Sequence, residues 1–279
     1  MTEANPSAPS APEPSTGPKR PILSAAGVSK RFTIGTGRDT ATVDALSGID
    51  VEVQKGEFVC LLGASGCGKS TLLRIVAGFE RPSEGTVAMY GKPIAGPGPE
   101  RGMVFQDYGL FPWLTVRENI TFGPRERGIA RPHVEEIGDR FTDMVGLGKF
   151  SGYYPAQLSG GMKQRVAIAR VLANDCELLL MDEPFGALDA LTRERLQAEL
   201  LDIWQQTRLT VLFVTHSVEE AVFLADRVLV RSAGPGRIAE DVRIDLPRPR
   251  DVSSPAFNDV RRALTGRLTS HLALGGTGG

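Results

Sequence analysis

The chain has 279 residues, and its 32 basic and 33 acidic side chains leave a formal net charge of -1, so bulk electrostatics does not favour binding to nucleic acid or an anionic membrane. The length allows a sizeable core, and no apolar run approaches the roughly 18 residues that are needed to cross a bilayer. The three cysteines lack CxxC spacing, which argues against a zinc site or a disulfide framework.

The beginning of the chain, residues 1–21, is rich in Pro, Ala, Ser, Thr and Glu and offers almost nothing to bury. This composition predicts a disordered tail, and without a basic stretch followed by an apolar core we expect no secretory signal there. From Ile22 to about residue 53, apolar residues alternate with polar ones through turn signals such as 35–37. This alternation predicts antiparallel strands.

A short apolar run at 58–62 predicts a buried strand, and the pattern of 71–77 predicts a helix that ends at Gly78. Two more strand-like runs follow, at 85–90 and 102–106.

A glycine loop joins the strand at 58–62 to the helix that follows it. Residues Gly63 to Thr71 match the pattern GxxxxGK[ST], and strand, glycine loop and helix form the context in which this pattern binds phosphate. The glycines let successive backbone N–H groups converge, and the positive end of the helix faces the same point. Lys69 can reach the β and γ phosphates, and the Ser70 hydroxyl can complete the shell of a Mg2+ ion. The residues assigned to the nucleotide are Gly63, Ala64, Ser65, Gly66, Cys67, Gly68, Lys69, Ser70 and Thr71.

Helical patterns dominate from about 116 to 172, which predicts a helical subdomain inserted between strands. The α/β pattern then resumes, with strands expected at 178–182, 210–214 and 227–230 and helices at 191–206 and 218–225. This alternation implies a largely parallel sheet with ligands at the carboxyl ends of its strands. Beyond residue 250 the pattern of strands and helices becomes weak. For the C-terminal extension, 251–279, we expect a short amphipathic helix at 257–268 and partial disorder.

Polar side chains stand where the later strands end. Asp182 ends a run of four apolar residues, so its carboxylate can hold Mg2+, and Glu183 is free to orient or deprotonate a water. His216 follows the strand at 210–214 and can hydrogen-bond the γ-phosphate and hold the attacking water. Gln106 also ends an apolar run, and its amide can contact metal and water. Asp182 and Glu183 could instead be an acidic pair that is solvated at the end of a strand, and His216 a structural histidine. The glycine loop, which is expected nearby, disfavours both alternatives.

A second helix start with exposed backbone N–H groups is expected at residue 159. Ser159 is a good N-cap, and Gly160 and Gly161 follow it directly before an apolar helical pattern. This arrangement predicts another anion site, although an ordinary capped helix would have the same pattern.

These segments stand in the order of the Walker A, Q-loop, signature, Walker B, D-loop and H-loop motifs, and the chain resembles the ATP-binding cassette (ABC) ATPases over roughly residues 25–245. The matching segments are 63–71, Gln106, 158–165, 178–183, 187–189 and His216. The resemblance implies the α/β P-loop NTPase fold of ABC ATPases, with a mostly parallel core sheet, an antiparallel β subdomain and an inserted helical subdomain. It implies an ATPase domain over residues 22–250.

The resemblance also implies a head-to-tail homodimer that binds ATP and Mg2+. Ser159 and Gly161 of one subunit would cap the γ-phosphate that Lys69 of the other subunit binds. It assigns Glu183, His216 and Gln106 to catalysis and Ser70, Gln106 and Asp182 to the metal, and it adds Gly160 and Asp189 to the nucleotide site. Phe32 falls where the family stacks an aromatic ring on adenine, although a strand residue of the core would also be aromatic.

Five further segments resemble the nitrate, sulfonate and taurine import ATPases, and the combination is most similar to taurine import ATP-binding proteins. They are 96–98, 110–113, 184–190, 219–225 and 234–237. Two residues depart from the pattern of these import ATPases. Ser217 stands where an aspartate usually follows the histidine, and Cys176 stands where a proline usually precedes the Walker B strand. Neither change removes a catalytic group, so we expect at most a small effect on activity. The resemblance implies two transmembrane permease subunits, a periplasmic binding protein for taurine or another sulfonate, and a location at the cytoplasmic face of the bacterial inner membrane.

Other functions remain open at this point. Nitrate is the alternative solute, and a silent nucleotide-binding regulator is disfavoured because Lys69, Asp182 and Glu183 are all present. A soluble ABC ATPase that acts on nucleic acid or ribosomes lacks support from any basic face or coiled coil, and no nucleic-acid partner is expected. An exporter is disfavoured because the exporter ATPases of this family are commonly fused to a transmembrane domain, although an exporter with a separate permease stays open. Leu110, Phe111 and Trp113 either anchor a partner or pack inside.

Overall fold

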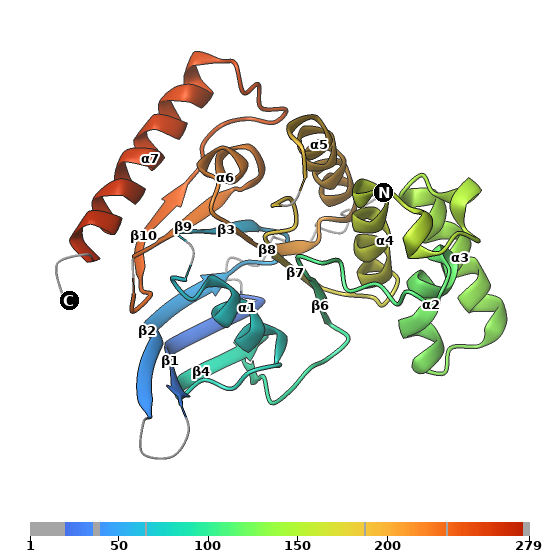
Figure 1. Cartoon of the computed structure of the whole chain (residues 1–279), viewed down its shortest axis with the longest axis horizontal. Coiled ribbons are helices and arrows are strands. Elements are labelled where there is room, and N and C mark those ends of the chain that lie inside the picture. The colour runs from blue at the N-terminus through green and yellow to red at the C-terminus, as the bar shows by residue number, and fades with distance from the viewer. Residues whose placement is uncertain (1–19, 36–39, 65, 187, 233, 276–279) are drawn as a thin grey trace, which may run out of the picture.

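The computed structural model describes residues 20–35, 40–64, 66–186, 188–232 and 234–275. Most of the tail expected at 1–21, and the last four residues, lie outside this part of the chain. Within it the strands form a six-stranded sheet and a four-stranded sheet, and helices cover both (Figure 1). None of the described helices is long and apolar enough to span a membrane.

The larger sheet has the strand order β10-β9-β3-β8-β7-β6, and every neighbouring pair is parallel except β10 with β9. Its strands are β3 (Phe58–Leu62), β6 (Arg101–Val104), β7 (Leu178–Asp182), β8 (Thr210–Thr215), β9 (Arg227–Arg231) and β10 (Ile238–Arg243). The mostly parallel core sheet expected from the sequence is confirmed. The sequence did not predict β10, whose residues are mostly half-buried or exposed and give no apolar run.

Strand β3 shows why this sheet has to be covered on both faces. Its five residues are all buried, and alternate side chains join different cores. Phe58, Cys60 and Leu62 pack with the helices of one face, whereas Val59 and Leu61 pack with α1 and the smaller sheet. Side chains of successive strand residues point to opposite faces, so a run without polar residues specifies a central strand.

The smaller sheet is antiparallel and has the order β2-β1-β4-β5, which confirms the antiparallel subdomain. Its strands are β1 (Leu23–Ile34), β2 (Ala41–Val53), β4 (Glu84–Met89) and β5 (Lys92–Pro93). Helix α1 (Lys69–Ala77) lies between the two sheets and buries Leu72, Leu73 and Val76. It ends at Gly78, whose φ of 82° is accessible mainly to glycine and closes the last turn.

The helical region lies beyond β6, at the end of the molecule that is far from α7 (Figure 1). It consists of α2 (Val116–Glu126), α3 (Arg131–Met144), two short turns (Gly148–Phe150 and Pro155–Gln157) and α4 (Gly160–Leu172). Thr115 and Glu118 form a capping box that fixes the start of α2. Residues of α4 such as Val166 and Ile168 join the same core as the central strands, which anchors this region to the larger sheet.

The remaining helices cover the outer face of the larger sheet. They are α5 (Ala190–Thr207), α6 (Val218–Leu224) and α7 (Pro255–Gly275). The short helix expected at 257–268 is therefore too short, because α7 has 21 residues. Phe257 and Leu264 are buried against the core, and the buried guanidinium of Arg250 donates to the carbonyls of Val222 and Ala225. The division into domains at residue 250 stays a prediction.

Candidate functional site

The polar residues that the sequence singled out gather at one edge of the larger sheet. Strands β3, β8, β7 and β6 are adjacent and parallel, so their carboxyl ends meet at this edge. The glycine loop follows β3, His216 follows β8, Asp182 ends β7 and Gln106 follows β6 by two residues. Parallel topology thus brings together side chains that are far apart in the sequence.

A cleft of about 560 Å3 opens at this edge, and half of the predicted site residues line it. The lining residues are Phe32, Ala45, Gly66, Gly68, Lys69, Ser70, Thr71, Gln106, Asp182 and Glu183. Gly63 and Cys67 are buried behind this surface, and Ser65 lies outside the described residues. Ala45, from the antiparallel sheet, was not predicted, because the sequence does not show which strand of that sheet reaches the cleft.

The glycine loop needs glycine at position 68. Gly68 has a φ of 80°, and a Cβ added there would lie 2.4 Å from the carbonyl oxygen of Ala45. Gly66 has a φ of 81° and open space around it. These two left-handed glycines, on either side of Cys67, turn the backbone so that α1 starts directly behind the cleft, with its unpaired N–H groups facing it.

Lys69 is only 4% exposed, and the loop itself holds its ammonium group. Its Nζ donates to the carbonyl oxygens of Gly63 and Ala64, both at 2.9 Å, and lies 3.4 Å from Oε1 of Glu183. These contacts place a positive charge at the floor of the cleft. The charge suits an anionic ligand, which would exchange with Glu183 as its partner.

Ser70 and Asp182 meet on the other side of Lys69. The Ser70 hydroxyl donates to Oδ1 of Asp182 at 2.9 Å. Burial raises the pKa of Asp182, while the Ser70 hydrogen bond opposes that rise. One hydroxyl and one carboxylate at hydrogen-bond distance fit Mg2+, because this ion takes few protein oxygens and completes its shell with phosphate and water. The described residues contain no group of three His, Cys, Asp or Glu side chains that would suggest a different metal.

Glu183 occupies a constrained position between Lys69 and His216. Its φ is 44°, a left-handed conformation that is unusual for glutamate, and its N–H donates to the carbonyl of Val214 at 3.0 Å. Its Oε2 lies 3.0 Å from Nδ1 of His216, whose side chain is 56% exposed. Left-handed residues outside glycine concentrate at functional sites, and here the conformation aims the carboxylate into the cleft.

Gln106 and Phe32 stand at the rim. Gln106 is exposed and approaches the backbone at Gly186, where an added Cβ would lie 3.8 Å from its Nε2. Phe32 is half-buried in β1, and the ammonium of Lys30 lies 4.9 Å from the centre of its ring. The ring faces the cleft rather than a fully buried core, so it is accessible to a planar ligand.

The start of α4 is not among the described residues that line the cleft. Ser159 is exposed and accepts a hydrogen bond from the N–H of Met162 at 3.3 Å, as expected for an N-cap. An added Cβ at Gly160 would lie 3.3 Å from Leu188, so this start lies beside the segment that leads to Asp189. Asp189 is itself the N-cap of α5. Its carboxylate accepts a hydrogen bond from the N–H of Thr192, which lowers the pKa of Asp189.

The two departures from the family pattern have local roles. Ser217 is the N-cap of α6 and accepts from the N–H of Glu220 at 3.3 Å. The Cys176 thiol accepts from the N–H of Gly102 and donates to the carbonyl of Leu178, and burial raises its pKa to about 12. Neither side chain lines the cleft.

Beside Gln106, a smaller groove of about 390 Å3 runs between β6 and α2. Phe111 lines it and packs on Phe122 at 4.5 Å, while Trp113 is 69% exposed. Leu110 is half-buried against the core. The sequence left open whether these three side chains anchor a partner or pack inside. Leu110 and Phe111 pack partly inside, whereas Trp113 is exposed and accessible to a partner.

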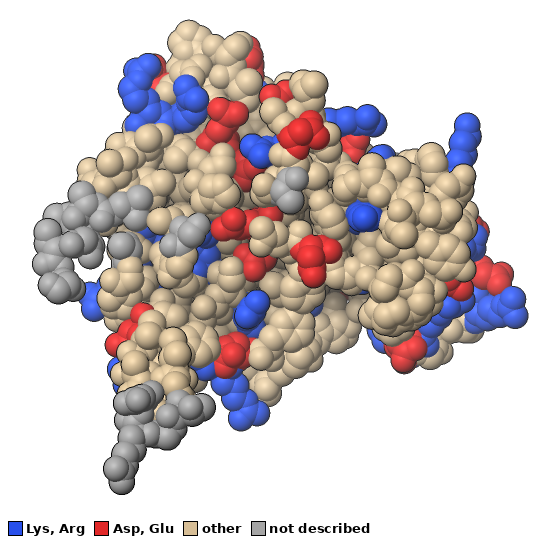
Figure 2. Space-filling view, in the orientation of Figure 1, with Lys and Arg blue, Asp and Glu red and all other residues tan. Residues whose placement is uncertain are grey.

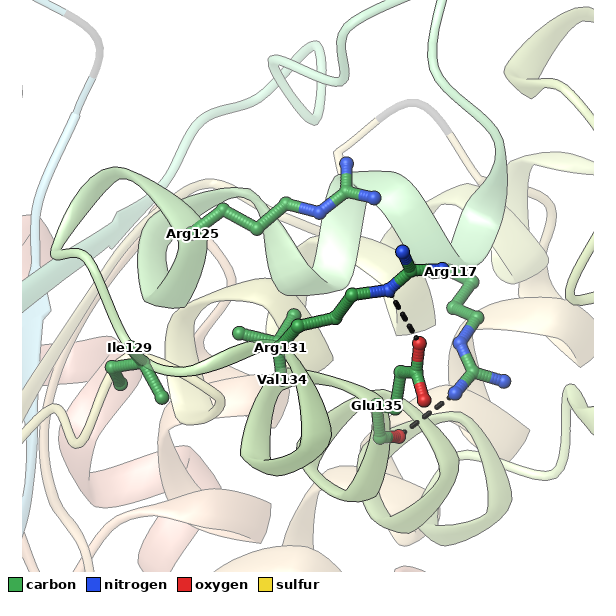
Figure 3. A pocket seen from close by; sticks show the side chains of 6 residues that line it. All are labelled: Arg117, Arg125, Ile129, Arg131, Val134 and Glu135. Carbon is green, nitrogen blue, oxygen red and sulfur yellow. Dashed lines mark hydrogen bonds and ion pairs between the residues drawn. The ribbon is translucent and has the colours of Figure 1, made fainter.

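A larger hollow of about 690 Å3 lies on the helical region, between α2 and α3 (Figure 3). Arg117, Arg125 and Arg131 line it, but Arg131 is paired with Glu135 and Arg117 with Asp139. It has no glycine loop, and none of the predicted site residues lies in it. On the face drawn in Figure 2, acidic and basic side chains of the described residues are interspersed rather than gathered in a basic stripe.

Comparisons with known proteins agree with this geometry. The profile of the ABC transporter family matches residues 46–186. An uncharacterized ABC transporter ATP-binding protein of Methanocaldococcus jannaschii is 58% identical over 222 residues, which is 80% of this chain and 83% of that protein.

Several relatives are named for a solute, and nitrate, bicarbonate and taurine all appear among them. The nitrate import ATP-binding protein NrtD of Synechocystis sp. is 53% identical over a match that covers 79% of this chain and 83% of NrtD. The taurine import ATP-binding protein TauB of Ruegeria pomeroyi is 49% identical, covering 80% and 82%. Among solved structures, the dimeric post-hydrolysis state of the ATP-binding cassette MJ0796, bound to ADP and Pi, superposes with a TM-score of 0.68 at 30% identity. The superposition covers 81% of this chain and 100% of the MJ0796 chain.

Proposed function

The chain belongs to the ABC transporter family, and from this premise we propose that it is the ATP-hydrolysing subunit of a bacterial importer. The observation that carries the proposal is the cleft in which Lys69, Ser70 and Asp182 converge with Glu183. The names of the nitrate and taurine relatives support import as the direction of transport.

In the proposed reaction, the β and γ phosphates of ATP replace Glu183 as the anionic partner of Lys69. The N–H groups at the start of α1 donate to the same phosphates. Ser70 and Asp182, with Gln106, would hold Mg2+, which when bound offsets the negative charge of the phosphate oxygens. Phe32 would stack on the adenine.

Hydrolysis needs a base for the attacking water, and Glu183 is the carboxylate placed for that role. As the water oxygen bonds to the γ-phosphorus and the bond to the ADP oxygen breaks, Glu183 accepts a proton from the water. His216, which is 3.0 Å from Glu183, would orient this carboxylate and contact the γ-phosphate. Gln106 at the rim would orient the water.

The cleft is open, and we propose that a second copy of the chain closes it. At the start of α4 Ser159 is exposed, Gly160 is half-buried and Gly161 is buried, and we propose that the N–H groups of this first turn donate to a partner's phosphate. Asp189 lies beside this start and would join the same interface. The MJ0796 cassette, which is dimeric with ADP and Pi, supports such an arrangement.

For the permease we propose docking at the groove that Phe111 lines, with Trp113 as an exposed anchor. Two transmembrane permease subunits and a periplasmic binding protein would complete the importer, and the chain would sit at the cytoplasmic face of the inner membrane. The segment that carries Phe111 begins close after Gln106, so nucleotide binding and docking share one short stretch of chain.

The proposed solute is a small oxyanion. The sequence favours taurine or a related sulfonate, with nitrate as the alternative, and the relatives include import proteins for both. Solute recognition would reside in the permease and binding protein, so this chain alone does not distinguish the two.

Two measurements test the proposal. Released phosphate reports whether the purified chain hydrolyses ATP with Mg2+, and no release above a buffer blank overturns the enzymatic role. In proteoliposomes that contain the permease, binding protein loaded with taurine should stimulate hydrolysis, with nitrate as the second arm. Stimulation by nitrate alone would make nitrate the proposed solute in place of taurine, and stimulation by neither would remove both solutes from the proposal.

A further inference from the structure

An arginine is buried behind the glycine loop, and the proposed reaction does not use it. Arg231 is the last residue of β9 and is 0% exposed. No carboxylate in the described part of the chain forms an ion pair with it, whereas Arg227 on the same strand pairs with Asp241 and Glu57. A fully buried guanidinium without a carboxylate is costly, and such groups are rarely retained for packing alone.

The side chain runs beneath the loop from one end to the other. At Gly63 an added Cβ would lie 3.1 Å from Cβ of Arg231, and at the far end Nη1 donates to the carbonyl oxygen of Gly68 at 3.3 Å. An added Cβ at Gly236 would lie only 1.9 Å from Nη2 and 2.1 Å from the carbonyl of Cys67. Glycine at 236 leaves the space that the guanidinium occupies, and glycine at 63 leaves room beside Cβ of Arg231.

The guanidinium is only partly satisfied. Within the described residues Nε and Nη2 have no hydrogen-bond partner. Burial lowers the pKa of Arg231, but a guanidinium remains protonated at neutral pH. Among the described residues its charge therefore has no carboxylate partner, while the opposite face of the same loop lines the cleft.

We propose that Arg231 is a positioning residue for the phosphate chain of the nucleotide. From behind the loop it holds the carbonyl of Gly68 inward, which keeps the loop's N–H groups turned to the cleft, and its charge attracts the phosphates through a medium that excludes water. Coulombic attraction through the low-dielectric loop is screened little by salt and grows with the number of phosphate charges. This inference rests on the proposed ATP-binding function.

The test measures the dissociation constants of ATP and ADP, each with Mg2+, for wild type, Arg231→Met, Arg231→Gln and Arg231→Lys. Methionine removes charge and hydrogen bond, glutamine removes the charge but keeps a donor, and lysine keeps the charge. We expect Met and Gln to weaken ATP binding about tenfold and ADP binding about threefold, and Lys to stay within about threefold of wild type for both. Arg227→Met is the matched control and should leave both constants unchanged.

Stability separates this role from a merely structural one. Because the neutral variants remove an uncompensated buried charge, their thermal midpoints without nucleotide should not fall, although the stabilisation that ATP adds should shrink. Equal weakening of ATP and ADP, Lys as weak as Met, or wild-type ATP binding in Arg231→Met and Arg231→Gln would each overturn the inference. If wild type itself bound no ATP, the proposed function would fail first.

Discussion

The cleft and the start of α4 are both places where a helix begins with unpaired N–H groups, yet they are built differently. At the cleft a buried lysine, a hydroxyl and two carboxylates surround the start of α1. At Ser159 the start of α4 is exposed, and the nearest side chains to Gly160 and Gly161 are Leu188, Tyr108, Leu196 and Thr192, with no lysine or carboxylate among them.

The difference separates two tasks. The cleft can bind an anion and also activate a water, because its charged groups are held by the core sheet. The start of α4 can only offer N–H groups, so it adds to a site that another surface has formed. Under the proposed function, a complete site would therefore need two copies of the chain, one for each task.

The largest expected effect removes the base from the cleft. Glu183→Gln keeps the shape of the side chain but cannot accept a proton, so turnover should fall by about 10^2 to 10^4 while ATP still binds. Phosphate release and equilibrium binding measure the two quantities. Glu194→Gln, on the exposed face of α5, is the control and should match wild type. Wild-type turnover in Glu183→Gln would remove this residue from catalysis.

Next in size is the loss of the buried charge at the floor of the cleft. Lys69→Met should weaken ATP binding about 30-fold, because a charge-assisted contact to phosphate is lost. Lys149→Met, at an exposed position in the helical region, should bind as wild type does. Equal affinities for Lys69→Met and wild type, measured by calorimetry, would show that the cleft does not bind phosphate through this lysine.

The start of α4 should behave in the opposite way. Ser159→Ala should leave the ATP affinity of the isolated subunit unchanged but lower turnover about fivefold, because one contact to the partner's phosphate is lost. Thr115→Ala removes an equivalent N-cap from α2 and should leave turnover unchanged. If both variants lost turnover equally, helix stability rather than a shared site would be the cause.

Much of the cleft could be predicted, because parallel strands end at the same edge and the polar residues directly follow apolar runs. That reasoning places the loop, Gln106, Asp182 and Glu183 together. It cannot find Arg231, since an arginine after three apolar strand residues is ordinarily at the surface and only the packing of Gly236 shows otherwise.

The same limit applies to the fold. Central strands such as 58–62 and 178–182 are unbroken apolar runs, and their positions were predicted closely. The length of α7 was not, because Phe257 and Leu264 are nearly its only fully buried residues and the rest of the helix has no strong pattern. Likewise β10 is an edge strand, and its stability comes from pairing with β9 rather than from its own sequence.

A smaller effect concerns pH at the cleft. Burial raises the pKa of Asp182, so the folded state binds this proton more tightly than the unfolded chain does. The resulting stability is complete below the unfolded pKa of about 3.9 and is lost as pH rises through the folded pKa. Asp182→Asn should therefore raise the thermal midpoint at neutral pH by about 1–2 °C in nucleotide-free protein and flatten this pH dependence. Exposed Asp202→Asn is the control, and an identical pH profile in Asp182→Asn would contradict the account.

The smallest effect is expected where the chain departs from its family. Ser217→Asp replaces one good N-cap by another at the start of α6, so turnover should change by less than about twofold. A change of about tenfold in phosphate release would mean that this position acts on the neighbouring His216 rather than as a cap.

The central claim is that one chain forms half of a working site. It is tested by the mass of Glu183→Gln in sedimentation with ATP and Mg2+, alone and combined with Gly160→Asp. An aspartate at the first position of α4 favours the helix but would repel the partner's phosphate. With ATP and Mg2+ we expect Glu183→Gln to be a dimer and the double variant Glu183→Gln/Gly160→Asp to be a monomer. A monomer that has bound ATP in the single variant, or a dimer in the double variant, would contradict it.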